Sequence, residues 1–155
     1  MSIKWRCTLC GQCCSSYTAF VLPGAVERLQ ESLQRPMSAF ITFYRASDFE
    51  GTLAESDQHY LFRTKRGPMA MCLSRVNLPE GDPGCVFLRD GLCSAHQCRP
   101  LVCRQYPFQP QDPANVGGPF KLMSGPCFGR YAEDETVDET SARQNYRLFQ
   151  GQQEE

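Results

Sequence analysis

The apolar and polar positions of the chain predict a helix near its start. Val26, Leu29 and Leu33 recur at near-helical spacing with charged and polar residues between them, which is typical of an amphipathic helix. This helix opens at the Pro-Gly pair 23–24 and ends at Pro36. Two further helical segments are expected, a short helix or turn that holds Phe40, Ile41 and Tyr44 and a peripheral helix at 142–149.

Apolar runs between proline- and glycine-rich breaks predict several short strands. Eleven prolines and twelve glycines divide the chain, so long regular elements should be few. The expected fold class is α+β, a small, loop-rich single domain with a short antiparallel sheet and few helices, organised around a cysteine metal site. Strands are expected at 17–22, 59–64, 69–76, 85–88 and 120–124, with one or two helical turns within 93–103.

Length and charge narrow the choice of protein class. A chain of 155 residues suits one domain, which we place at 1–132, followed by an acidic segment with its peripheral helix at 133–155. The net charge is -1 and the basic residues are scattered, so the pattern of a nucleic-acid-binding protein is missing. Arg63, Lys65 and Arg66 form a tight basic cluster, which is more typical of a solvated strand end than of a phosphate site.

Cysteine usage indicates a reducing compartment. The first residues contain no apolar core of a signal peptide, and no apolar run approaches the length of a membrane span, so a cytoplasmic location is expected. Ten cysteines in such a compartment favour thiolate ligands over disulfides. The alternative is an extracellular disulfide scaffold, against which the adjacent pair Cys13-Cys14 argues.

The densest chemical signal is a run of four thiols within eight residues. Cys7, Cys10, Cys13 and Cys14 would share one face if the segment were helical. If the segment forms a turn instead, Gly11 gives the backbone the freedom that a metal-binding knuckle needs. The C-x-x-C-x-x-C spacing equals the first three ligand positions of the bacterial ferredoxin run, although the fourth cysteine followed by proline is absent.

Further cysteines follow in a specific sequence context. The chain reads C-V-F-L at 85–88 and R-P-L-V-C-R-Q-Y-P-F at 99–108, with Cys93 before the second motif and Cys127 after it. Together with the C-x-x-C-G-x-C-C start, this pattern resembles a family of small cysteine-cluster proteins that are described as zinc- or iron-chelating and named for their C-x-x-C-x-x-C-C motif. The resemblance spans residues 7–129.

The resemblance implies which cysteines bind metal. Cys72 and Cys98 fall outside the family pattern; Cys72 is expected to pack in a strand, and Cys98 is a spare ligand candidate. His96 stands where such proteins commonly carry tyrosine, and we expect it at the surface or beside a ligand. The eight metal ligand candidates are Cys7, Cys10, Cys13, Cys14, Cys85, Cys93, Cys103 and Cys127.

Eight thiolates in one domain need cations among them, because their mutual repulsion would otherwise keep them protonated. Neighbouring arginines favour thiolate and can donate hydrogen bonds to sulfur. The ferredoxin-like triplet favours an iron-sulfur cluster of the [4Fe-4S] type over Zn²⁺, which remains the alternative cofactor. The arginines near cysteines are Arg6, Arg99, Arg104 and Arg130.

These patterns favour a cytosolic metal-binding protein that carries electrons, senses redox state or handles metal with a protein partner. One alternative is a zinc-stapled structural or interaction protein. Another is an accessory domain or small relative of an S-adenosylmethionine-dependent protein lysine methylase, because the resembling domain also occurs in flagellin lysine N-methylases. The chain lacks a G-x-G loop after a strand and the C-x-x-x-C-x-x-C spacing of radical enzymes, so a binding protein is favoured over an enzyme.

Overall fold

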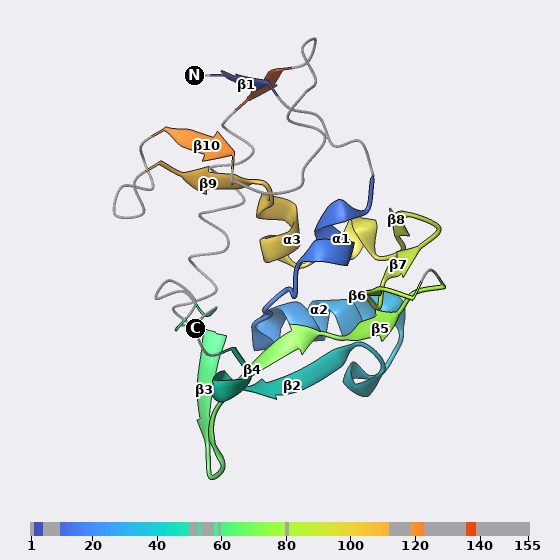
Figure 1. The fold of residues 1–155 in the computed structure, drawn as a ribbon, viewed down its shortest axis with the longest axis vertical. Helices are drawn as coiled ribbons and strands as arrows, with labels where there is room; N and C mark the ends of the chain where they lie inside the picture. The colour runs from blue at the N-terminus through green and yellow to red at the C-terminus, as the bar shows by residue number, and fades with distance from the viewer. Residues whose placement is uncertain are drawn as a thin grey trace.

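A computed structural model of the chain describes residues 2–4, 10–49, 53, 58, 60–79, 81–111, 119–122 and 136–138. An antiparallel sheet in the order β2-β4-β3 lies at the lower end of the molecule in Figure 1. Short helices and several two-stranded sheets lie above it, so the expected α+β, loop-rich fold is confirmed. The sheet strands are β2 (Ile41–Arg45), β3 (Leu61–Thr64) and β4 (Gly67–Leu73).

Strand β4 is central because it pairs along both edges. One edge pairs with β2 and the other with β3. Residues 19–21 pair with β4 on the same edge as β3, farther along the strand. The Leu73 amide donates to the Ala19 carbonyl and the Val21 amide donates to the Met71 carbonyl, both at 2.9 Å. The strand expected at 17–22 is therefore present as an extended segment with one bridge to β4.

The expected helix is confirmed as α2 (Pro23–Leu33). It buries Ala25, Val26 and Leu29, and it ends at Gln34, whose φ of 51° lies in the left-handed region. Leu29 and Phe40 are 0 % exposed and lie at the centre of the apolar core. The core joins α2, the sheet and the segment around Phe87.

The prediction of a short helix or turn that holds Phe40, Ile41 and Tyr44 is wrong. Residues 37–39 form a 3₁₀ turn, η1 (Met37–Ala39), but Ile41 and Tyr44 lie in strand β2. The spacing of Phe40, Ile41 and Tyr44 suits a helix, yet the run Ile-Thr-Phe-Tyr consists of β-branched and aromatic residues that fit a half-buried strand. Pairing with β4 decides the conformation, with Ile41 opposite Leu73.

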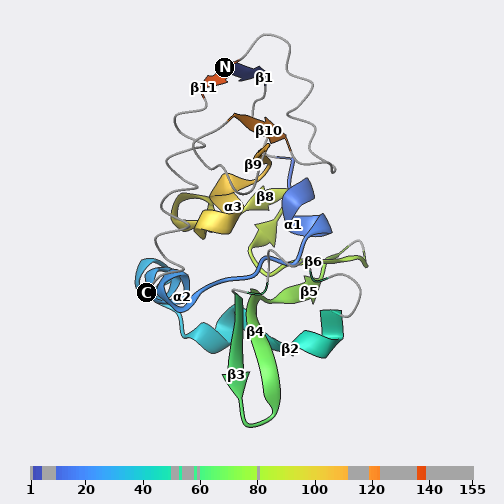
Figure 2. The same ribbon diagram turned by 90° about the vertical axis from the view of Figure 1, so that its left-hand side faces the viewer.

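Short elements carry most of the cysteines above the sheet (Figures 1 and 2). The expected strand at 85–88 is divided, because the Val86 amide turns to donate to the Ser74 carbonyl at 2.8 Å. The helical turns expected within 93–103 should stop before Pro100, and the turn at 96–98 does so, but a second helix begins directly after Pro100. These elements are α1 (Gln12–Ser16), β5 (Arg75–Asn77), β6 (Pro83–Cys85), β7 (Leu88–Arg89), β8 (Leu92–Cys93), η4 (His96–Cys98) and α3 (Leu101–Gln105).

Two more antiparallel pairs complete the described chain. Strand β10 confirms the strand expected at 120–124, and the helix expected at 142–149 lies outside the described residues. Within the described part, no helix is long and apolar enough to span a bilayer. The remaining elements are η2 (Ala46–Phe49), β9 (Phe108–Pro110), which pairs with β10 (Phe120–Leu122), and β1 (Ser2–Lys4), which pairs with β11 (Thr136–Asp138).

Candidate metal centre

The first cysteine segment reaches the second through a close backbone contact at Gly11. Its φ is +70°, and a Cβ built there would lie 2.7 Å from the Gly91 carbonyl oxygen and 2.9 Å from Leu88 Cδ1. Gly11 is thus a turn that leads into helix α1, which carries Cys13 and Cys14. The described part of the segment therefore combines the two expected geometries, because the turn at Gly11 is followed by a short helix.

The surface that Gly11 contacts is the β7–β8 hairpin. Asp90 and Gly91 form its two-residue turn, with φ values of 49° and 76°. Positive φ at both positions is the property that makes Asp-Gly pairs favourable in such hairpins. This Asp-Gly signal is in the sequence, and it could have predicted the hairpin that delivers Cys93.

Arg75 joins α1 to the strand that carries Cys85. Its guanidinium donates hydrogen bonds to the carbonyl oxygens of Tyr17 at 2.8 Å and Ser15 at 2.7 Å, and a third to Pro83. Helix α1 is therefore fixed against β6 by one side chain. Sequence reasoning missed this residue, because Arg75 lies far from both partners along the chain and next to no cysteine.

Three thiols converge on that of Cys14. Its thiol group lies within hydrogen-bonding reach of the sulfur atoms of Cys13, Cys85 and Cys93. Cys14 has one S–H, which it can donate to one of these sulfurs at a time. This hydrogen bond lowers the pKa of Cys13 to about 6, that of Cys93 to about 7, and that of Cys85 as well. Hydrogen bonding to these three sulfurs raises the pKa of Cys14. Cys14 therefore keeps its proton, whereas its three partners favour the thiolate form.

Arginine charge supports these thiolates. Arg99, one of the arginines that the sequence places near cysteines, lies near enough to Cys13 and Cys93 to add to the lowering of both pKa values. Arg75 acts in the same direction on Cys85. Burial raises the pKa of the fifth thiol, Cys103, to about 12, and the other thiols nearby add to this.

Comparison with protein families identifies the family of this chain. Residues 6–141 match the CxxCxxCC family model, described as "Putative zinc- or iron-chelating domain". The chain belongs to the CxxCxxCC family. No curated protein and no solved structure matches it.

The other predicted positions of this CxxCxxCC domain that the structure describes differ in exposure. Cys10 is exposed beside Gly11, and the Cys98 thiol donates to the Ala95 carbonyl at 3.5 Å. His96 is exposed on η4. Cys72 is 0 % exposed within β4, where packing was expected, and burial raises its pKa to about 12. Four predicted residues lie outside the described part: Cys7, Cys127, Arg6 and Arg130.

The donor set of the CxxCxxCC domain fits zinc or iron in kind. Thiolate sulfur is the ligand that both metals take in cysteine sites. Among the described residues, however, no group of three or more cysteine, histidine or carboxylate side chains surrounds a position for a metal ion. Cys14 interacts instead with the thiols of Cys13, Cys85 and Cys93, and a bound ion would replace these interactions with metal–sulfur bonds. The residues that would hold it are Cys13, Cys14, Cys85 and Cys93.

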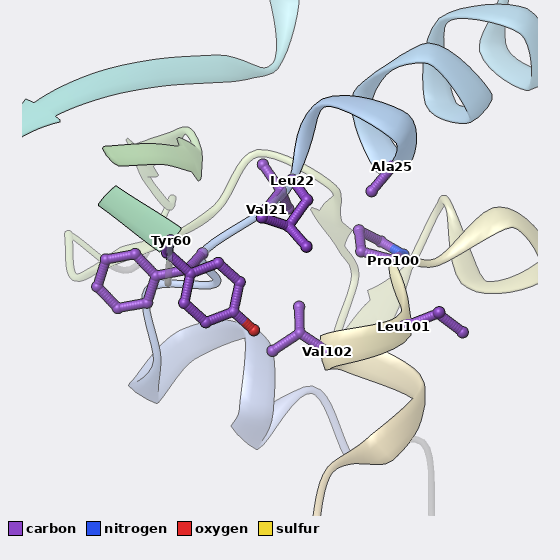
Figure 3. Close-up of a pocket in the computed structure, with 8 residues that line it drawn as sticks. Val21, Leu22, Ala25, Tyr60, Pro100, Leu101 and Val102 are labelled. Atoms are coloured by element: carbon purple, nitrogen blue, oxygen red, sulfur yellow. The ribbon is translucent and has the colours of Figure 1, made fainter. Parts of the chain in front are cut away.

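A small apolar pocket lies beside this centre, between the start of α2 and the start of α3 (Figure 3). Figure 3 shows Val21, Tyr60 and Val102 pointing into it. Its volume of about 10 Å³ has space for one water molecule at most. This pocket cannot hold an organic cofactor.

Proposed function

We propose that the protein binds a zinc or iron ion through the thiolates of Cys13, Cys14, Cys85 and Cys93. The observation that carries the proposal is the interaction of the Cys14 thiol with three others. Cys13 is its neighbour on α1, whereas Cys85 and Cys93 come from β6 and β8. Membership of a family described as zinc- or iron-chelating supports the proposal. The other ligand candidates, Cys7, Cys10, Cys103 and Cys127, complete a second site or exchange with the inner four.

The convergence of three thiols on Cys14 favours one ion over a cluster. Thiolates that bind a single tetrahedral ion at about 2.3 Å are about 3.8 Å from each other. In a [4Fe-4S] cluster each cysteine binds a different iron atom, so the sulfurs stand farther apart. The cluster is the second candidate, because the C-x-x-C-x-x-C spacing of Cys7, Cys10 and Cys13 is that of ferredoxin ligands.

The role of the metal follows from which ion is bound. Zinc has no redox chemistry and would staple the fold for an interaction, whereas iron would add electron transfer or redox sensing. Either role operates with a protein partner. The eight described cysteines are free thiols, which supports a cytoplasmic location. The lack of a G-x-G loop after a strand supports a binding protein over an S-adenosylmethionine-dependent methylase.

Metal and acid-labile sulfide analysis of the anaerobically purified protein, together with its visible spectrum, tests this proposal. We expect zinc or iron without sulfide, released by a variant in which Cys14 is serine. Iron with equimolar sulfide and a brown colour would replace the single ion with the cluster. Protein that takes up neither metal after reconstitution would overturn both.

A further inference from the structure

We propose that the metal enters and leaves through one face of the molecule, and that its donor or acceptor is a protein with an acidic surface. The face consists of Cys10, Cys13, Leu92, Arg99 and Arg104, and we name it the exchange face. This inference rests on the proposed metal binding. It adds the direction of transfer and the chemistry of the partner.

Exposure of the thiols gives the direction. Cys10 and Cys13 are exposed, Cys14 and Cys93 are half-buried, and Cys85 is buried. A ligand from another protein can reach the ion only beside an exposed sulfur, because the buried side is filled by the core around Cys85. Transfer by stepwise replacement of ligands therefore begins at Cys13, with Cys10 next to it as a second accessible donor.

Leu92 gives this face an apolar contact point. Its side chain is 50 % exposed at the tip of the β7–β8 hairpin. The close approach of Gly11 to Gly91 holds this tip against the segment that contains Cys10 and Cys13. A partner that covers Leu92 would therefore stand over the exposed thiols.

Charge on the exchange face selects an acidic partner. Arg99 lies near enough to Cys13 to help lower its pKa, and the side chain of Arg104 donates to the backbone carbonyl oxygens of Arg99 at 3.0 Å and Gln97 at 3.1 Å. On the hairpin, Arg89 and Asp90 carry opposite charges. The positive charge that remains on the face comes from Arg99 and Arg104. Such charge attracts acidic surfaces and raises association rates by about 10- to 1,000-fold at low salt.

The other apolar and basic end of the molecule provides a matched control. Phe43 and Phe62 are 44 % and 36 % exposed and contact each other at 6.0 Å between ring centroids. Arg45 is exposed on the same strand as Phe43. This end of the sheet lies away from α1 and α3 in both views (Figures 1 and 2). Substitutions there change charge and apolar exposure without touching the exchange face.

The test measures transfer of Zn²⁺ from the loaded full-length protein to two synthetic peptides. Both peptides carry the same Cys-x-x-Cys acceptor, one flanked by glutamates and the other by lysines. At low salt we expect the glutamate peptide to take zinc at least about 10-fold faster, with the difference lost in about 0.5 M salt. Arg104→Glu should reverse the preference and Leu92→Asp should slow both peptides, whereas Arg45→Glu and Phe43→Asp should change neither rate.

Equal rates for the two peptides, or equal effects of Arg104→Glu and Arg45→Glu, would overturn the inference. Zinc affinity measured on each variant keeps this outcome separate from a weaker site. A protein that binds no metal contradicts the proposed function itself, whereas a protein that binds metal and releases it at a charge-independent rate contradicts only the exchange face.

Discussion

The sheet end of the molecule and its thiol end share one apolar core but differ in the contacts that hold their own elements together. The sheet end, β2, β3, β4 and α2, has a seven-residue central strand paired on both edges and buries Leu29 and Phe40 completely. The thiol end, α1, β6, β7, β8, η4 and α3, has elements of two to five residues. Its parts are joined by the Gly11 contact, the Arg75 hydrogen bonds and the sulfurs around Cys14.

This difference shows which part of the chain depends on metal. Apolar burial stabilises the sheet end by about 25 cal/mol per Å² in any ionic condition. At the thiol end, sulfurs with lowered pKa values gather negative charge at one point, which a cation must compensate. Removal of metal should therefore loosen the thiol end and leave the sheet end folded.

Cys14→Ser should break the thiol end most severely. Serine oxygen is a poor substitute for thiolate toward zinc or iron, so we expect at least about a 100-fold loss of metal affinity. Cys72→Ser is the matched control in the sheet end. It should keep its metal and lower the free energy of unfolding by about 1–3 kcal/mol, because a hydroxyl would be buried. Metal analysis and urea titration measure both, and metal loss from Cys72→Ser alone would contradict the assignment.

Acid should weaken metal binding without affecting the sheet end. Thiols bind metal as thiolates, so protons compete at every ligand. Above pH 7 binding mainly displaces the proton on Cys14, and below that pH protons on Cys93 and Cys13, with pKa values of about 7 and 6, must also leave. From pH 7.5 to 5.5 the affinity should fall by about three to four orders of magnitude.

Competition with a buffered zinc indicator across this pH range gives the affinity. The slope of log affinity against pH should steepen from about one toward about three as the pH falls. A constant slope of one would show that Cys13 and Cys93 do not bind the ion. Circular dichroism of the sheet should stay unchanged, since burial keeps Cys72 neutral with a pKa of about 12.

Gly11→Ala should displace the first cysteine segment from the β7–β8 hairpin. The new Cβ would lie 2.7 Å from a backbone oxygen, which cannot move away as a flexible side chain can. We expect metal affinity to fall by about 10- to 100-fold, in line with loss of supporting geometry around a metal site. Gly91→Ala shares the positive φ but meets nothing within 4 Å, so it should cost about 1 kcal/mol of stability and keep its affinity. Similar metal affinities for the two variants would show that the contact of Gly11 with Gly91 does not support the metal site.

Arg75→Met should have the smallest effect of the four. It removes the hydrogen bonds that fix α1 to β6 and a positive charge near Cys85. Because the side chain is partly exposed, we expect a loss of about 2 kcal/mol at most, seen as faster amide exchange in α1. Arg45→Met, at the sheet end, is the control and should leave exchange in α1 unchanged. Equal exchange in both variants would show that Arg75 does not hold α1.

Local pattern predicted the sheet end with one error. The spacing of Val26, Leu29 and Leu33 gave α2, and apolar runs between proline and glycine gave β3 and β4. The error, a helix in place of β2, arose because Ile41 and Tyr44 satisfy a helical spacing by coincidence. Only pairing with β4 separates the two, and that pairing joins residues distant in sequence.

At the thiol end the motif predicted the chemistry but not the supports. Four of the eight expected ligands meet around Cys14, and Cys103 lies near them. The hydrogen bonds of Arg75 and the close contact of Gly11 with Gly91 could not be predicted. Each joins segments that come together only in the complete fold. The family resemblance named the four cysteines that interact around Cys14, whereas the partners that hold the backbone are set by tertiary contacts.

The position of Cys14 and its partners in the chain also sets the order of assembly. Every residue of the three-stranded sheet lies between Cys14 and Cys85 in sequence. During synthesis the sheet is thus complete before the second group of sulfurs leaves the ribosome, and closing so long a loop is slower than forming the hairpin of β3 and β4. An ion that arrives early meets only the first cysteines. An ion at the proposed site can therefore gain all four ligands only after the strands of the sheet have been synthesised.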